Sequence, residues 1–85
     1  MSVDRYDIPL PKIEGAQSEI VVAAWLKQPG DSVRAGEIVA EVSTDKVNVE
    51  IASPVTGVLE AILAGEGATV VEGTLLARVV VPPRS

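Results

Sequence analysis

The sequence predicts an all-β fold: a flattened barrel or sandwich of two antiparallel sheets, about four strands each, with an internal pseudo-two-fold symmetry. Three observations support this. β-Branched residues dominate the 85-residue chain, and glycine or proline interrupts it every few residues. A stretch at residues 24–42 also recurs at residues 61–79. Long helices with a 3.6-residue hydrophobic period do not fit between such interruptions, whereas short strands do.

The expected strands follow one another closely along the chain. They cover residues 4–9, 19–26, 38–43, 47–51, 57–63 and 75–81, with short extended pieces near 32–34 and 69–71. After the second strand, Pro29 and Gly30 predict a type II turn, because proline presets φ and glycine accepts a positive φ. The clearest alternation lies in residues 38–51. Residues expected to point inward there are Ile38, Ala40, Val42, Val47, Val49 and Ile51. Residues expected to point outward are Val39, Glu41, Ser43, Asn48 and Glu50.

The internal repeat determines how these strands are arranged. Residues 24–42 align without gaps on residues 61–79, and the identical pairs include Gly30/Gly67 and Gly36/Gly73. Glycine often marks a bend or a φ that other residues resist, so glycines at matching positions indicate that the two halves follow the same backbone path. Two copies are too few for a solenoid and favour two half-sheets packed face to face. The same offset carries Lys46 to positions 9 and 83, so we expect Lys46 at the pole opposite the termini.

Composition excludes several classes of function. The chain has no cysteine and no histidine, which removes disulfides, the commonest metal ligands and nucleophiles activated by histidine. Without these residues we do not expect an enzyme, and 85 residues with 47% hydrophobic content are enough for one domain only. A net charge of -5 and only two aromatic residues argue against nucleic-acid binding. No apolar run is long enough to span a membrane, and no signal peptide is evident, so a bacterial cytoplasm, or the mitochondrial matrix in a eukaryote, is expected.

One turn departs from ordinary hairpin chemistry. In EVSTDKVNVEI, residues 41–51, two alternating runs meet at Asp45 and Lys46, although tight hairpins favour glycine or asparagine there. A type I turn from Thr44 to Val47 suits these residues. A break in a local rule without structural gain indicates function. The simpler interpretation is a solvated lysine at a turn.

This turn belongs to a wider pattern that covers residues 5–80. Its elements are Thr44-Asp45-Lys46-Val47, then Ser53-Pro54 with Gly57, and upstream Gly30-Asp31 with Val33. With these elements the chain closely resembles the lipoyl domains of 2-oxo acid dehydrogenase acyltransferases. The resemblance implies that Lys46 carries lipoic acid in amide linkage, with Asp45 and Val47 as the flank that the lipoate-attaching enzyme recognises. It also implies a lipoyl domain over residues 1–81, while residues 82–85 begin a proline-containing linker or simply end the chain.

The resemblance further implies a carrier role within a larger acyltransferase chain. The lipoyl-lysine would act as a swinging arm for acyl groups and reducing equivalents. It would move between a thiamine-diphosphate-dependent 2-oxo acid decarboxylase, the acyltransferase core and dihydrolipoyl dehydrogenase. Two alternatives stay open: a biotinyl carrier domain, and an unmodified structural barrel of an adaptor protein. Biotin acceptors place methionine on both sides of the lysine, so Asp45 and Val47 favour lipoate.

Overall fold

The computed structural model describes residues 4–13 and 19–82, and all the regular structure in them is β-strand. The strands are β1 (Asp4–Pro9), β2 (Ile20–Trp25), β3 (Ser32–Val33), β4 (Ile38–Ser43), β5 (Asn48–Ala52), β6 (Gly57–Ile62), β7 (Thr69–Val70) and β8 (Leu75–Val81). The predicted elements are all present, and no strand end differs from its predicted position by more than one residue. No helix in the described ranges is long and apolar enough to cross a membrane.

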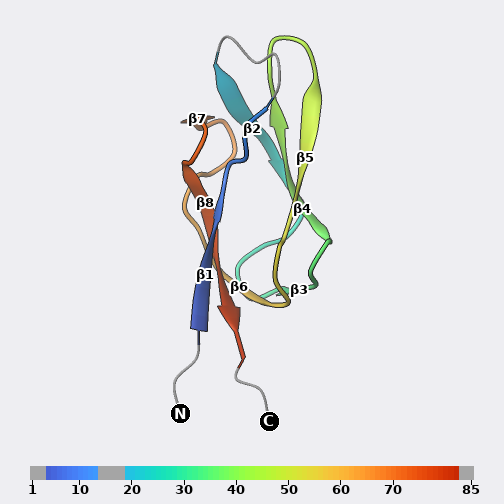
Figure 1. The fold of residues 1–85 in the computed structure, drawn as a ribbon, viewed down its shortest axis with the longest axis vertical. Helices are drawn as coiled ribbons and strands as arrows, with labels where there is room; N and C mark the ends of the chain where they lie inside the picture. The colour runs from blue at the N-terminus through green and yellow to red at the C-terminus, as the bar shows by residue number, and fades with distance from the viewer. Residues whose placement is uncertain (1–3, 14–18, 83–85) are drawn as a thin grey trace.

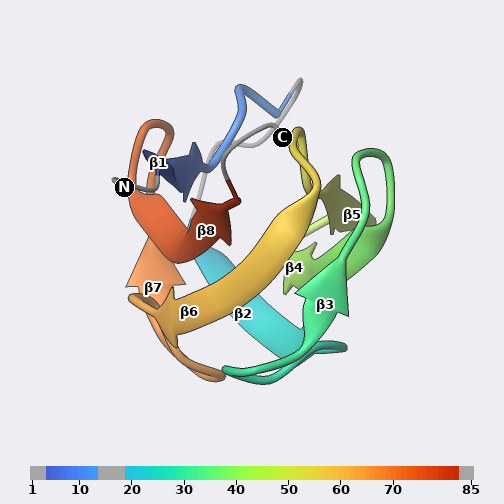
Figure 2. The same ribbon diagram turned by 90° about the horizontal axis from the view of Figure 1, so that it is seen from below.

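The strands form two antiparallel sheets of four, in the orders β1-β8-β6-β3 and β5-β4-β2-β7. Figure 1 shows the sheets side by side along the long axis of the molecule. Figure 2, from the end where the chain starts and finishes, shows the strands arranged around a common interior. The predicted sandwich of two four-stranded antiparallel sheets is therefore confirmed.

The two sheets are related by the predicted pseudo-two-fold symmetry. Exchanging β1 with β5, β8 with β4, β6 with β2 and β3 with β7 converts one strand order into the other. Hydrogen bonds between the halves obey the same exchange: Gly30 N–H donates to Leu59 O at 2.8 Å, and Gly67 N–H donates to Val22 O at 2.8 Å. Each of these two glycines has a positive φ, 98° and 89°. The repeat in sequence is thus a repeat of backbone path.

The repeat has a larger offset at its beginning. Ile8 pairs with Ala77, and the equivalent pair is Ile51 with Ala40. β1 and β5 are therefore related by 43 residues instead of 37, so the expected equivalence of Lys46 with position 9 is wrong. A longer connection between β1 and β2 than between β5 and β6 accounts for the difference. The predicted polarity still holds, because Figure 1 shows the β4–β5 turn at one end and the paired ends of β1 and β8 at the other.

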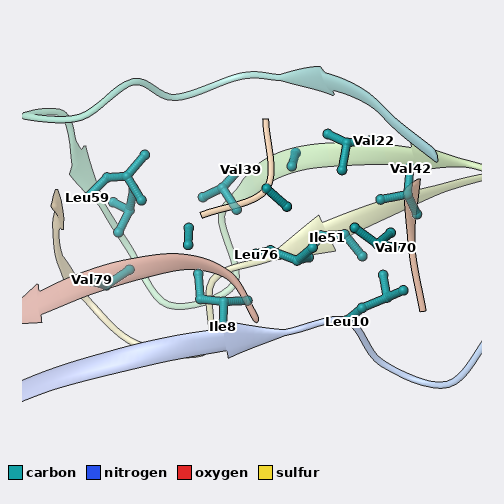
Figure 3. Packing of buried hydrophobic residues seen from close by; sticks show 14 of the residues in the cluster. Ile8, Leu10, Val22, Val39, Val42, Ile51, Leu59, Val70, Leu76 and Val79 are labelled. Atoms are coloured by element: carbon teal, nitrogen blue, oxygen red, sulfur yellow. The ribbon is translucent and has the colours of Figure 1, made fainter. Parts of the chain in front are cut away.

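A single apolar core lies between the sheets (Figure 3). Its largest fully buried side chains are Leu10, Leu59, Leu76, Val22, Val33, Val39, Val42 and Val79. Both sheets contribute, as the sandwich requires. Ser53 is also buried, but its hydroxyl donates to the Val55 carbonyl at 2.6 Å, so its burial leaves no unpaired donor.

The expected alternation fails at three residues, Ile38, Val39 and Val47. Val39, predicted to point outward, is completely buried, and Ile38 is only half-buried. The pairing of β4 with β5 shifts register between Ile38 and Ala40, and such a bulge interrupts the period of two. Val47, predicted to point inward, is 53% exposed because it still belongs to the turn and β5 begins at Asn48.

One local prediction is confirmed, and a contact of Trp25 adds to it. The Pro29-Gly30 turn has the positive φ at Gly30, and Asp31 N–H donates to Gln28 O at 2.9 Å, as a type II turn requires. Trp25 packs against the core, and its Nε1–H donates to the Ala64 carbonyl at 2.9 Å. The indole therefore connects β2 to the segment that follows β6.

Candidate functional site

Lys46 lies at the tip of the turn between β4 and β5. The side chain is exposed, as are those of Asp45 and Val47. Within the described part of the chain, no hydrogen bond or ion pair engages the Lys46 ammonium group. The structure thus brings the three predicted site residues together at one pole and leaves the amine accessible to another molecule.

The turn is held by the hydroxyl of Thr44. Its Oγ1 accepts from Lys46 N–H at 3.2 Å and from Val47 N–H at 3.0 Å, and donates to Val47 O at 2.9 Å. The backbone closes the turn from the other side, where Thr44 N–H donates to Val47 O at 2.9 Å. A threonine hydroxyl often stabilises a turn by hydrogen bonding to backbone groups two and three residues later in the chain. It orders the backbone on both sides of the lysine without using the lysine side chain.

Glycine is unnecessary in this turn because its backbone stays in the ordinary region. No residue other than glycine has a positive φ in the described ranges, so Asp45 and Lys46 do not adopt the type I′ turn of tight hairpins. Below the turn, Ser43 Oγ donates to Asn48 Oδ1 at 2.7 Å across the first pair of the β4–β5 ladder. The hairpin therefore reaches its tip with both strands connected by side chains as well as backbone.

Thr44 and the Ser43–Asn48 pair are site residues that the prediction of Asp45, Lys46 and Val47 omitted. Thr44 had a detectable signal, since threonine at the first position of a turn often bonds the backbone that follows. The Ser43–Asn48 bond depends on the register of β4 with β5, and the alternation alone does not determine it. Both contacts support the geometry of the tip and leave its chemistry to Lys46.

A shallow hollow adjoins the tip on the outer side of β2 and β4. It encloses about 540 Å³ and is lined by Glu19, Val21, Ala23, Ser43, Thr44 and Asp45. Its walls are short side chains with one carboxylate from the residue before β2 and another from the turn. The site therefore consists of an exposed amine beside an open, acid-rimmed surface.

The chemistry open to this site is limited. No group of three or more potential metal-ligating residues occurs in residues 4–13 and 19–82. The turn has no histidine or cysteine to act as base or nucleophile. A lysine ε-amine on a flexible stem can, however, form an amide with a carboxyl group, and the exposed tip lets an enzyme reach it. The arrangement suits a residue that is modified and then presented to other active sites.

Comparison with known proteins identifies the family. The model of the family described as "Biotin-requiring enzyme" matches residues 7–79, which includes both sheets and the Lys46 turn. Among curated proteins, a dihydrolipoyllysine-residue succinyltransferase component of the 2-oxoglutarate dehydrogenase complex from Staphylococcus saprophyticus is 47% identical over 71 residues. That match covers 84% of this chain and 17% of the relative.

A second relative serves a different complex. The dihydrolipoyllysine-residue acetyltransferase component of the pyruvate dehydrogenase complex from Mycobacterium tuberculosis is 49% identical over 76 residues, covering 89% of this chain and 14% of that protein. The chain thus spans less than a fifth of the length of either relative. The match identifies a module common to both kinds of complex.

The fold has a counterpart among solved structures. The lipoyl domain of the 2-oxoglutarate dehydrogenase complex from Azotobacter vinelandii superposes with a TM-score of 0.66 and 32% sequence identity. The superposition covers 85% of this chain and 94% of that domain. The two-sheet sandwich of this chain is therefore the fold of a lipoyl domain.

Proposed function

Because the chain belongs to the biotin- and lipoyl-carrying family and is a lipoyl domain, a non-catalytic carrier, we propose that Lys46 is the residue that carries its lipoate. The observation that carries this proposal is the position of the Lys46 amine, exposed at the tip of the β4–β5 turn. Lipoate attached there supplies a reversible disulfide and a thioester-forming sulfur, which a chain without cysteine lacks.

The residues around Lys46 suit this role. The Thr44 hydroxyl fixes the backbone of the turn, so the attaching enzyme meets one conformation of Asp45, Lys46 and Val47. The lysine stem adds reach and freedom beyond that fixed tip. Amide formation at Nζ also removes one positive charge, which takes the formal net charge from -5 to -6.

We assign the parent chain to the acyltransferase components of 2-oxo acid dehydrogenase complexes, in line with its relatives. The lipoyl-lysine then accepts an acyl group at a thiamine-diphosphate-dependent decarboxylase and delivers it at the acyltransferase core. Dihydrolipoyl dehydrogenase restores the disulfide. A tethered carrier makes each visit close to intramolecular, which raises the effective concentration of its cargo.

Intact-mass spectrometry after co-expression with a lipoate-attaching enzyme tests the assignment. The wild-type chain should gain the mass of one lipoyl group, and Lys46→Ala and Lys46→Arg should gain none. Lys12→Ala is the matched control, since Lys12 is also exposed, and it should be modified like the wild type. An adduct that persists in Lys46→Ala would place the site elsewhere. A biotin adduct, or no adduct with active enzyme and lipoate present, would refute the proposed cargo.

A further inference from the structure

The Lys46 turn is built differently from the four glycine turns in residues 4–13 and 19–82. In each glycine turn, the N–H of the fourth residue donates to the carbonyl of the first at 2.9 or 3.0 Å, and the third residue is a glycine with a positive φ. These turns cover residues 28–31, 34–37, 65–68 and 71–74. In residues 44–47 the third residue is Lys46, whose φ is not positive, and Val47 N–H donates to the Thr44 hydroxyl at 3.0 Å. A side-chain oxygen therefore takes the role that a backbone carbonyl has in the other turns.

The Thr44 hydroxyl also fixes the peptide unit that precedes the lysine. Lys46 N–H donates to Thr44 Oγ1 at 3.2 Å. A type II turn has this central peptide turned over relative to a type I turn, because ψ of the second residue and φ of the third both change sign. A peptide turned over in this way would point the Lys46 N–H away from Oγ1. The hydrogen bond therefore selects one orientation of the Asp45–Lys46 peptide, and with it one direction for the start of the lysine side chain.

Thr44 is the residue that holds this direction. Within the described part of the chain, every hydrogen bond made by residues 45–47 has Thr44 as its partner. The Lys46 side chain is exposed and forms no ion pair with the described residues. Two of the Thr44 bonds, to the amides of Lys46 and Val47, need the hydroxyl as acceptor, whereas the bond from Thr44 N–H to Val47 O does not. Without the hydroxyl the hairpin can still close, but its tip is no longer held in one shape.

We propose that Thr44 is a positioning residue for the attachment of lipoate, because its hydroxyl selects the turn conformation that the attaching enzyme binds. This rests on the proposed function of Lys46. Thr44 acts through the backbone amides of Lys46 and Val47 and takes no part in the reaction itself. An enzyme that binds the tip as a shaped surface needs that conformation, whereas a small acylating reagent reaches an exposed amine from any side. Loss of the hydroxyl therefore slows the enzymatic reaction and leaves the chemical reactivity of the amine unchanged.

Steady-state kinetics of a lipoate-attaching enzyme, with the unmodified chain as varied substrate, tests the proposal. Thr44→Val and Thr44→Ala should each raise the KM for the chain about 3- to 10-fold and leave kcat unchanged, because fewer molecules have the competent turn. Thr44→Ser keeps the hydroxyl and should stay within about 2-fold of the wild type. Thr56→Val is the matched control with an unchanged KM. Thr56 Oγ1 also accepts from a backbone amide, that of Ala35 at 2.9 Å, but in the connection between β5 and β6, away from the tip (Figure 1).

A second measurement separates positioning from accessibility. Acetylation of the Lys46 amine by an N-hydroxysuccinimide ester, followed by mass spectrometry of the peptide that contains Lys46, should proceed at the same rate in the wild type and all variants. The assay temperature is set below the unfolding midpoint of the least stable variant, so every protein compared is folded.

Four results would overturn the proposal: an unchanged KM for Thr44→Val, an equal rise in Thr56→Val, a Thr44→Ser variant as poor as Thr44→Val, or slower acetylation of Thr44→Val. Failure of the proposed function looks different, because the wild type itself then gains no lipoyl group at Lys46. A wild type that is lipoylated at Lys46, together with a Thr44→Val variant that is an equally good substrate, refutes the positioning role alone.

Discussion

Replacing Gly57 by alanine should be among the most damaging single-methyl additions in this protein. Gly57 begins β6, which is hydrogen-bonded to β8, and is completely surrounded there. A Cβ at this position would lie 2.1 Å from the backbone oxygen of Val80 and 2.9 Å from Cγ1 of Val79. The nearest atom is backbone, so no side-chain rotation relieves the contact. The two central strands of the sheet have to separate.

The cost can be estimated from that separation. Non-bonded heavy atoms prefer about 3.5 Å or more, so β6 and β8 must move apart by roughly 1.4 Å locally to relieve the 2.1 Å contact. Overpacking of this kind costs about 1–3 kcal/mol. Weakening two hydrogen bonds of the ladder adds about 0.5–1.5 kcal/mol each. The expected loss of about 3–4 kcal/mol is a large share of the free energy of unfolding of a chain of this size, which is about 4–13 kcal/mol.

Thermal and urea unfolding, followed by circular dichroism and by Trp25 fluorescence, measures this loss. Gly57→Ala should lower the midpoint temperature by about 12–32 °C, since each kcal/mol corresponds to about 4–8 °C in a domain of this size. Gly65→Ala is the matched control because no atom lies within 4 Å of its added methyl, and it should change stability by less than about 0.5 kcal/mol. Gly30→Ala, with open space but φ of 98°, should lie between them at about 1 kcal/mol. A Gly57→Ala midpoint within about 2 °C of the wild type would refute the steric argument.

Two further predictions concern the turn and the ion pair of Asp7 with Arg78. Thr44→Val should lower the free energy of unfolding by about 1–2 kcal/mol and speed hydrogen exchange of the Lys46 and Val47 amides, because both amides lose their Oγ1 acceptor. Thr69→Val, at an exposed position of β7, is the control and should change neither quantity. The Arg78 guanidinium, by hydrogen bonding, lowers the pKa of Asp7 below its ordinary 3.8, so this carboxylate stabilises the fold above pH 3.8 and ceases to do so as the pH falls through the lowered pKa. Melting curves of the wild type and Asp7→Asn should therefore differ at neutral pH and converge in acid, and a gap that stays constant with pH would contradict this.

Local signals were sufficient for most of the fold. The β-branched runs and their glycine and proline breaks located every strand, because a short strand between turns depends mainly on its own residues. The offset of 37 residues revealed the symmetry because glycines at matching positions, such as Gly30 and Gly67, have the same positive-φ conformation. The Asp45-Lys46 turn drew attention to the site because it violated a rule of local turn chemistry. All of these features can be recognised in the sequence without knowing which strands pair.

Contacts between distant strands were not visible in that way. Val39 is buried because of a bulge in the pairing of β4 with β5, and a bulge depends on the partner strand as much as on its own. Gly57 is required because the Val80 carbonyl approaches it, a contact across the sheet that no spacing in the sequence shows. The two opposed carboxylates of Glu41 and Glu50 likewise become neighbours only through strand register.

The sequence by itself thus determined the strands, the repeat and a lysine between two alternating runs, since each follows from residue types and their spacing along the chain. Tertiary structure alone decided which strands pair, where the alternation breaks, and which side chains surround that lysine. The physical reason is that register and sheet packing bring together residues far apart in the chain. At the Lys46 turn both levels contribute: local chemistry forms the tip, and the pairing of β4 with β5 places Ser43 opposite Asn48 and Glu41 opposite Glu50 on the strands that lead to it.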